Sequence, residues 1–337
     1  MTLVKTCGKL YWAGEYAILV PGQLALIKAI PIYMTAEIKA SDGYRLYSDM
    51  FTYSVDLRPD SSYALIQETV ALVEEYLTAQ GVDLRPFTID IRGKMEREGK
   101  KFGLGSSGSV VVLVIKAMLA FYERPAERDL LFKLASAVLL KRGDNGSMGD
   151  IACIVSEDLV LYQSFDREKV AEWLEKEDLP TVLTRDWGFS IRNVETALDF
   201  DFLVGWTKEV AVSSHMVKQI KDNMNASFLQ ASKETVANLV KALEVGQEET
   251  IIDLLEQASQ LLEGLSSDIY TPLLRQLKNA SQDLKTVAKS SGAGGGDCGI
   301  ALSFDQDSTT LLKKRWADLG IELLYQERMG HDDKSEG

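Results

Sequence analysis

Seven residues, Gly103 to Ser109, have the composition of a binding loop for an anion. The segment reads Gly-Leu-Gly-Ser-Ser-Gly-Ser, and an apolar run from Val110 to Tyr122 follows it, interrupted only by Lys116. Such a run is too long for a typical strand, so we predict a buried helix that starts near Gly108, with Ser109 able to cap it. A glycine loop that leads into a helix presents free N–H groups and the positive end of the helix dipole to a phosphate. The alternative interpretation is a flexible loop before a core helix, and the segment lacks the pattern of a Walker loop.

Two charged residues beside other glycines are candidates for the chemistry of phosphoryl transfer. Lys9 follows Gly8 near the end of the first predicted strand. Its cation suits a phosphoryl group in transfer, although a solvated surface lysine is the alternative. Asp150 ends a glycine-rich turn over residues 143–150 and is either a carboxylate at a reaction centre or a cap of that turn. Asp144, in the same turn, is the second candidate.

The elements that must position these residues are predicted mainly from hydrophobic periodicity and from glycine and proline breaks. The prediction for the first half comprises strands over Leu3–Trp12, Ile30–Lys39, Tyr44–Tyr47 and Phe87–Arg92, a helix capped by Asp60–Ser62 that runs through Ala79 to a stop at Gly81, a helix over 126–142 opened by Pro125 and stopped by Gly143, and a strand over 151–155.

The second half is predicted to be rich in helices. The predicted elements are a strand over Leu198–Thr207, a helical stretch from Ser214 to Lys289 with breaks near Ser232, Gly246 and Gly264, a glycine-rich segment over 290–299, a strand over Ile300–Phe304, a helix over 307–319 and a strand over 321–326. Glycine-rich segments therefore recur along the whole chain, each beside a regular element. This arrangement suggests that several stretches of backbone meet around one polyanionic ligand.

Composition narrows the class of protein. The chain has 337 residues, a hydrophobic content of 46% and a net charge of −13, which favours two domains and argues against nucleic-acid binding. Three scattered cysteines, without a signal peptide or a run that could span a bilayer, indicate a cytoplasmic protein with no membrane partner. With only two histidines, His215 and His331, acid–base chemistry falls to Asp, Glu, Lys or Tyr. The sequence does not determine the oligomeric state.

Three segments together resemble the GHMP kinase family in both order and spacing. The first, here the N-terminal motif, is Gly8-Lys-Leu-Tyr-Trp-Ala-Gly-Glu-Tyr16, and the second is the glycine loop Gly103–Ser109. The third, here the C-terminal glycine motif, is Ser291-Gly-Ala-Gly-Gly-Gly-Asp-Cys298. The resemblance covers the whole chain. It departs from the family pattern at Gly108, where alanine is common, and in lacking the usual proline before the glycine loop.

The resemblance implies an α+β fold and an ATP-dependent kinase of small molecules. It implies an N-terminal half like domain 2 of ribosomal protein S5 over residues 1–190, a helix-rich ferredoxin-like half over 191–330, a frayed tail over 331–337, and an active site between the halves. Lys9 and Asp150 are then the catalytic pair. ATP is bound by Gly103, Leu104, Gly105, Ser106, Ser107, Gly108 and Ser109, with Mg²⁺ on the hydroxyl of Ser106 or Ser107.

The resemblance also implies an acceptor that is itself a phosphate monoester with a carboxylate. Tyr16 in place of the usual histidine, and Asp297 after the glycines, favour this branch of the family. The candidate contacts of the substrate are Tyr16, Lys101, Ser147, Ser213, Gly292, Ala293 and Gly294, with Arg192 weaker. The alternatives are a relative that phosphorylates an unphosphorylated alcohol and a catalytically silent relative that binds a metabolite.

Overall fold

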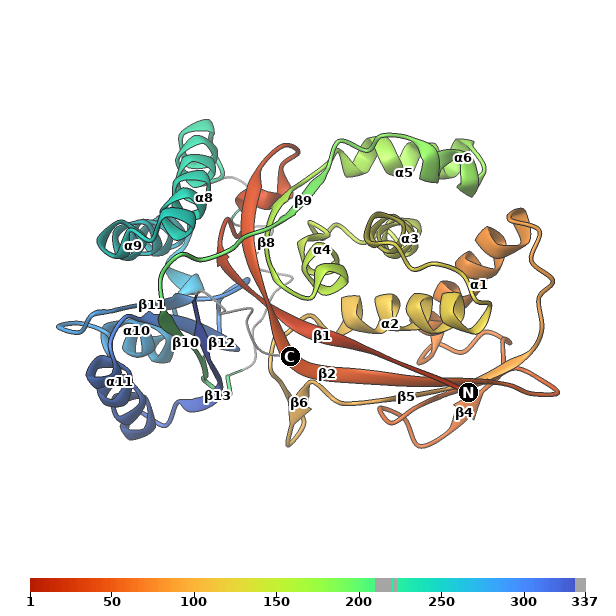
Figure 1. Ribbon diagram of the computed structural model, residues 1–337, viewed down its shortest axis with the longest axis horizontal. Helices are drawn as coiled ribbons and strands as arrows, with labels where there is room; N and C mark the ends of the chain where they lie inside the picture. Colours follow the sequence, from red (N-terminus) through yellow and green to blue (C-terminus); the bar gives the residue numbers. More distant parts are fainter. Residues whose placement is uncertain (210–219, 221–222, 331–337) are drawn as a thin grey trace.

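The computed structural model describes residues 1–209, 220 and 223–330, and within them the chain forms two α+β halves side by side (Figure 1). The first half contains a seven-stranded sheet in the order β4-β3-β5-β2-β8-β9, with β1 paired to β2. Its strands are β1 (Thr2–Ala13), β2 (Leu24–Ala40), β3 (Arg45–Ser48), β4 (Ser54–Val55), β5 (Phe87–Arg92), β8 (Leu159–Gln163) and β9 (Ser190–Asn193).

Helices cover one side of this sheet, with α2 next to β1 and β2 (Figure 1). They are α1 (Ala64–Ala79), α2 (Ser106–Phe121), α3 (Arg128–Lys141), α4 (Gly149–Ser156), α5 (Arg167–Lys176) and α6 (Leu179–Thr184). The apolar run after the glycine loop forms α2 and is almost wholly buried, because it packs on the sheet and against α1, α3 and α4. The predicted buried helix is thus confirmed, and it begins two residues before Gly108.

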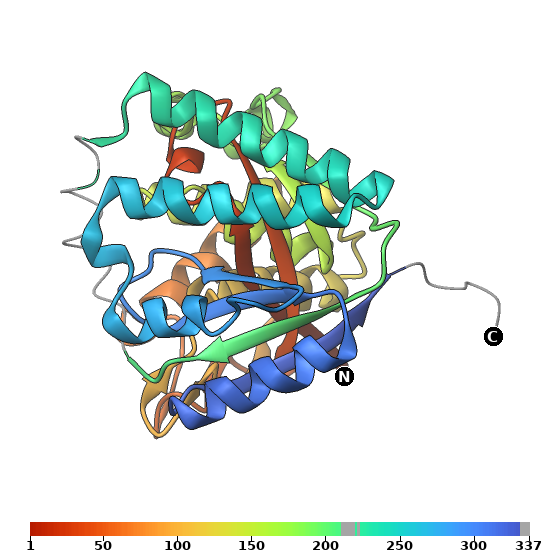
Figure 2. The same cartoon turned by 90° about the vertical axis from the view of Figure 1, so that its left-hand side faces the viewer.

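The second half is a four-stranded antiparallel sheet in the order β11-β12-β10-β13, with helices packed against it. Figure 2 shows α8 and α9 lying side by side above this sheet. The elements are β10 (Phe200–Trp206), α8 (Ala226–Val245), α9 (Glu248–Leu265), α10 (Pro272–Asn279), β11 (Thr286–Ser290), β12 (Cys298–Ser303), α11 (Gln306–Asp318) and β13 (Glu322–Met329).

The larger hydrophobic cluster among the described residues contains side chains from both halves. Trp12, on β1, is fully buried and packs edge-on against Phe200 and at a tilt against Phe202 of β10, with ring centroids 6.1 and 5.2 Å apart. Strand β1 therefore belongs to the first sheet and also packs against the second. Because β9 pairs with β8 and the second sheet begins at β10, we propose that the halves divide between Asn193 and Phe200.

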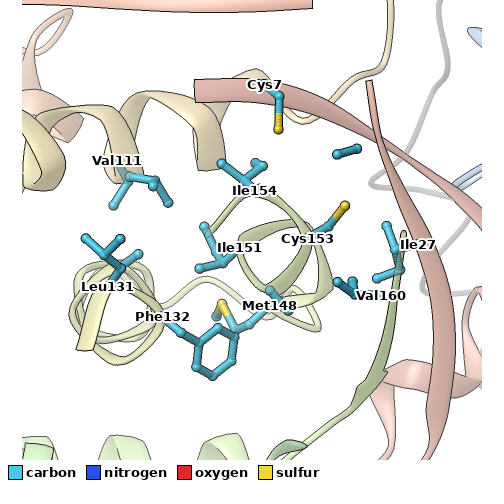
Figure 3. Close-up of a cluster of buried hydrophobic side chains, with 14 of the residues drawn as sticks. Cys7, Ile27, Val111, Leu131, Phe132, Met148, Ile151, Cys153, Ile154 and Val160 are labelled. Carbon is cyan, nitrogen blue, oxygen red and sulfur yellow. The ribbon is translucent and has the colours of Figure 1, made fainter. Parts of the chain in front are cut away.

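The prediction of a strand over 151–155 is wrong, because these residues form most of α4. Figure 3 shows Ile151, Cys153 and Ile154 of this helix in a cluster of buried side chains, together with Met148 and residues of β1, α2 and α3. A short apolar run that is buried on all sides has no periodicity that separates a strand from a helix. The correction matters for function, because it places Asp150 in the first turn of a helix.

Two predictions for the second half also need correction. Residues 286–290, expected at the end of a helical stretch, form strand β11 at the edge of the second sheet. No break occurs at Ser232, which lies inside α8, whereas Gly246 does end that helix with φ of 76°. Ser232 is buried against the neighbouring helix, so packing overrides the weak local preference of serine for a turn.

Candidate active site

The glycine loop ends at an uncapped helix N-terminus, as an anion site requires. Gly103 and Gly105 have φ of 77° and 80°, and Gly105 rather than Ser109 is the N-cap of α2. No side chain caps this helix end, so the first N–H groups remain for a ligand. The Ser109 hydroxyl instead donates to the Cys7 carbonyl at 2.7 Å, which anchors α2 to β1.

Lys9 lies directly against the glycine loop. Its backbone N–H donates to the Leu104 carbonyl at 3.0 Å, and its ammonium lies 3.4 Å from the carbonyl oxygen of Gly103. A Cβ at Gly105 would come within 2.9 Å of the Lys9 Cε. The residue is buried, so its charge acts in a region with little solvent. The sequence-predicted cation is therefore placed beside the predicted phosphate site.

Asp150 faces the same loop from the start of α4. One carboxylate oxygen accepts from the Ile151 N–H at 2.9 Å. The other lies 2.7 Å from where a Cβ at Gly108 would be, so glycine rather than the alanine common in the family fits this chain. Burial raises the pKa of the Asp150 carboxyl, and the nearby Lys9 ammonium opposes that rise. Asp144, by contrast, accepts from the Gly146 N–H in an exposed turn.

Tyr11, which the sequence analysis missed, connects Lys9 with the segment that carries Asp150. Its ring lies 5.5 Å from the Lys9 ammonium, and its hydroxyl is 3.1 Å from the Ser147 hydroxyl. Ser147 in turn accepts from the Gly149 N–H at 3.2 Å, at the start of α4. Burial raises the pKa of Tyr11, with the Asp150 charge as a further cause. Its position two residues after Lys9 on the same strand, and thus on the same face, is the signal that could have found it.

The C-terminal glycine motif closes the site from the second half. The Tyr16 hydroxyl donates to the Ala293 carbonyl at 2.5 Å, and the Ser291 hydroxyl donates to the Tyr11 carbonyl at 2.8 Å. At the other end of the motif, the Asp297 carboxylate lies 2.5 Å from where a Cβ at Gly103 would be. The three motifs therefore contact one another, although they are separated by most of the chain.

The basic residues that precede the glycine loop differ in their surroundings. Lys101 is exposed on β7 (Lys100–Lys101), which pairs with β6 (Glu96–Arg97), and it lines a small hollow together with Ser106. Arg97 forms an ion pair with Glu322, so its positive charge is already paired within the protein. Lys101 thus remains the candidate nearest to the glycine loop.

Of the remaining predicted residues, one forms a surface ion pair and two lie outside the described residues. Arg192 forms an ion pair with Glu244 on the surface, which argues against a substrate contact. Ser213, predicted to contact substrate, and His215 lie outside the described residues.

The cysteines pack in the interior. Cys7, Cys153 and Cys298 are all buried and unpaired, and burial raises the pKa of the Cys7 thiol to about 11. Figure 3 shows Cys7 and Cys153 among apolar side chains. Buried thiols of this kind are not nucleophiles.

Metal ligands are sparse in this part of the molecule. Among the described residues, no group of three or more His, Cys, Asp and Glu side chains could hold a metal ion. The glycine loop contains the hydroxyls of Ser106 and Ser107, and the Asp150 carboxylate lies against it. Such oxygen donors suit Mg²⁺, which is bound by few protein ligands together with substrate phosphates.

A glycine loop at a helix N-terminus, a lysine and an aspartate beside it, and a second glycine motif in contact with the loop define a small-molecule kinase. The model of the GHMP kinase N-terminal domain matches residues 64–157, and that of the C-terminal domain matches residues 239–322. The chain belongs to the GHMP kinase family and has its fold.

Within this family, the chain is more similar to some members than to others. The chain is 74% identical to the Streptococcus pneumoniae phosphomevalonate kinase whose structure contains phosphomevalonate and AMPPNP, with a TM-score of 0.96 over 98% of this chain and 100% of that one. It is 29% identical to the phosphomevalonate kinase of Streptomyces sp. (strain CL190) over 93% of each chain. The mevalonate kinase of Methanococcus jannaschii shares the fold, with 20% identity and a TM-score of 0.73 over 98% of each chain. In the described residues, no helix has the length and hydrophobicity to cross a membrane.

Proposed function

We propose that this protein transfers the γ-phosphoryl group of ATP to (R)-5-phosphomevalonate and forms 5-diphosphomevalonate, a step toward isoprenoid precursors. The observation that carries the proposal is the 74% identity, over 98% of this chain, to an enzyme solved with phosphomevalonate and an ATP analogue. The contact between the three motifs supports it, because both ligands of such an enzyme must meet at one point. The buried, unpaired cysteines are consistent with the cytoplasm as its location.

In this proposal, the glycine loop binds the phosphates of ATP through backbone N–H groups of residues 105–108. The Ser109 N–H, also predicted to bind ATP, instead donates to the Gly105 carbonyl at 3.0 Å. The uncapped N-terminus of α2 supplies partial positive charge without any side-chain movement. Ser106 or Ser107 holds Mg²⁺, which neutralises phosphate charge when it is bound. The oxygen donors present fit such an ion, so removal of divalent metal with EDTA should stop turnover and added Mg²⁺ should restore it.

Lys9 stabilises the phosphoryl group during its transfer, and Asp150 positions Lys9. A phosphate monoester has a second pKa of about 6, so near pH 7 most of the acceptor already lacks the proton that a base would remove. The main obstacle is repulsion between two phosphate groups, and a buried cation reduces it. Lys101, Ser147, Ser213 and the backbone of residues 292–294 hold the acceptor, with Tyr16 beside them.

The test is ATP turnover by the purified chain with a panel of acceptors. We expect kcat/KM for phosphomevalonate to exceed that for mevalonate at least about a hundredfold, because a site that pairs with a phosphate is left with unpaired charges by an acceptor that lacks it. A preference for mevalonate would favour a mevalonate kinase instead. Tight binding of phosphomevalonate without turnover would favour a silent metabolite-binding relative.

A further inference from the structure

A buried ion pair joins the two halves immediately behind the C-terminal glycine motif. The Lys289 ammonium, on β11, lies 2.6 Å from a carboxylate oxygen of Glu15, in the N-terminal motif. The two side chains are 1% and 3% exposed. Lys289 also donates to the Ser290 carbonyl at 2.6 Å, at the end of β11. Neither residue touches the glycine loop, so the proposed transfer step does not use them directly.

The segment that follows Lys289 is rich in glycine, so its backbone has no strong conformational preference of its own. Gly292, Gly294 and Gly295 have φ between 71° and 79°, in the left-handed region that glycine enters freely. Glycine-rich backbone of this kind has many accessible conformations, and fixing one of them costs conformational entropy. Its conformation here must therefore be set by contacts with neighbouring parts of the chain.

Three of those contacts come from the N-terminal motif. Ser291 donates to the Tyr11 carbonyl, Tyr16 donates to the Ala293 carbonyl, and Lys289 pairs with Glu15. The first two are neutral hydrogen bonds to residues inside the C-terminal glycine motif. The ion pair is charged and lies near the end of β11, just before the motif begins.

A buried ion pair is weak evidence for a gain in stability, because the cost of removing two charges from water offsets their attraction. Such a pair can instead fix a geometry, and among the described residues neither Glu15 nor Lys289 forms another ion pair. The Glu15–Lys289 pair differs in this respect from exposed pairs such as Arg92–Asp90, which solvent screens.

We infer that Glu15 and Lys289 are positioning residues that set the C-terminal glycine motif in the conformation that binds the acceptor. The inference rests on the proposed function, because it concerns the site of that acceptor. It predicts that loss of the pair weakens acceptor binding and leaves the ATP site largely intact.

The experiment separates positioning from stability by removing both charges together. In the double variant Glu15→Leu with Lys289→Met, no unpaired charge is left behind, and such replacements of a buried pair are often neutral for stability. We expect the melting temperature to stay near that of the wild type and KM for phosphomevalonate to rise about ten- to hundredfold, because small displacements in a site carry losses of that order. KM for ATP should change less than about threefold.

The matched control is Lys28→Met combined with Glu327→Leu. This pair also joins the halves, between β2 and β13, with the charged atoms 2.9 Å apart and largely buried side chains. Among the described residues it makes no hydrogen bond to the C-terminal glycine motif. We expect both Michaelis constants of this control to remain near the wild-type values.

If the double variant at 15 and 289 keeps both its stability and its KM for phosphomevalonate, the positioning role is wrong. The same conclusion follows if both Michaelis constants rise together, as a general loosening would produce. Wild-type turnover is measured first: if another acceptor is used instead, the proposed function fails, and the pair is then tested with KM for that acceptor.

Discussion

Lys9 passes so close to Gly105 that a Cβ on the glycine would lie 2.9 Å from the lysine Cε. The same Cβ would be 3.6 Å from the Cβ of Asp150. A single position in the glycine loop is thus in contact with both proposed catalytic residues. The absence of a side chain at residue 105 leaves room for the lysine at the place where phosphate is expected.

Gly105→Ala should abolish measurable ATP binding while the chain stays folded. The added methyl group displaces Lys9 and disfavours φ of 80°, at a cost of about 1–2 kcal/mol in stability. Gly143→Ala is the control, because Gly143 has φ of 76° but no atom within 4 Å of an added Cβ. Calorimetry with ATP should separate the two variants, whereas thermal unfolding should show similar losses. Equal ATP affinity in both would remove the glycine loop from the nucleotide site.

Lys9→Ala should reduce kcat about a hundredfold or more, and Asp150→Asn should reduce it less. The lysine supplies the positive charge that offsets phosphate repulsion, whereas asparagine keeps the shape and some hydrogen bonding of the aspartate. The rate of the Asp150→Asn variant should still follow ionisation of the acceptor near a pH of about 6. Steady-state kinetics between pH 5.5 and about 8.5 would check this range. An inactive Asp150→Asn variant beside a mildly affected Lys9→Ala variant would show that the aspartate removes a proton.

The stability of the protein should carry a pH dependence that comes from Asp150. Burial raises the pKa of this carboxyl above the ordinary value of 3.8, so the folded chain binds a proton there at higher pH than the unfolded chain. The stabilisation that the protonated Asp150 carboxyl provides is complete below its pKa in the unfolded chain. It is lost as the pH rises through its pKa in the folded chain. Urea unfolding across this range should therefore show the wild type losing stability relative to Asp150→Asn as the pH rises.

A second variant tests the cause of that titration. Lys9 lowers the pKa of Asp150, so in a Lys9→Ala background the loss of stability should be larger and should extend to higher pH. If the pH dependence is identical with and without Lys9, the two charges do not interact in the folded protein.

Lys101→Ala should raise KM for phosphomevalonate about ten- to hundredfold and KM for ATP much less. A charged hydrogen bond contributes roughly 1.5–3 kcal/mol, which corresponds to such a factor. Lys100→Ala is the matched control, since Lys100 is the neighbouring exposed residue of the same short strand. Equal small effects of the two substitutions would assign Lys101 to the solvated surface.

Local sequence was sufficient for the features that depend on a few adjacent residues. The glycines of residues 103–108 and the apolar run after them predict the loop and the buried helix, because backbone freedom and uninterrupted burial are both local properties. Strand β5 was predicted with the bounds that the structure has, since Phe87, Ile89 and Ile91 alternate cleanly with polar residues. The family resemblance then supplied Lys9 and Asp150, which composition alone left open.

Only the tertiary structure decided what those residues touch. Residues 151–155 form a helix and residues 286–290 a strand because of burial against distant elements, and no local period records such packing. The Glu15–Lys289 pair and the Tyr11–Ser147 contact join residues separated by 274 and 136 positions. A charge or hydroxyl acquires such a partner only when the sheets and helices bring it there, so these contacts follow from the fold as a whole.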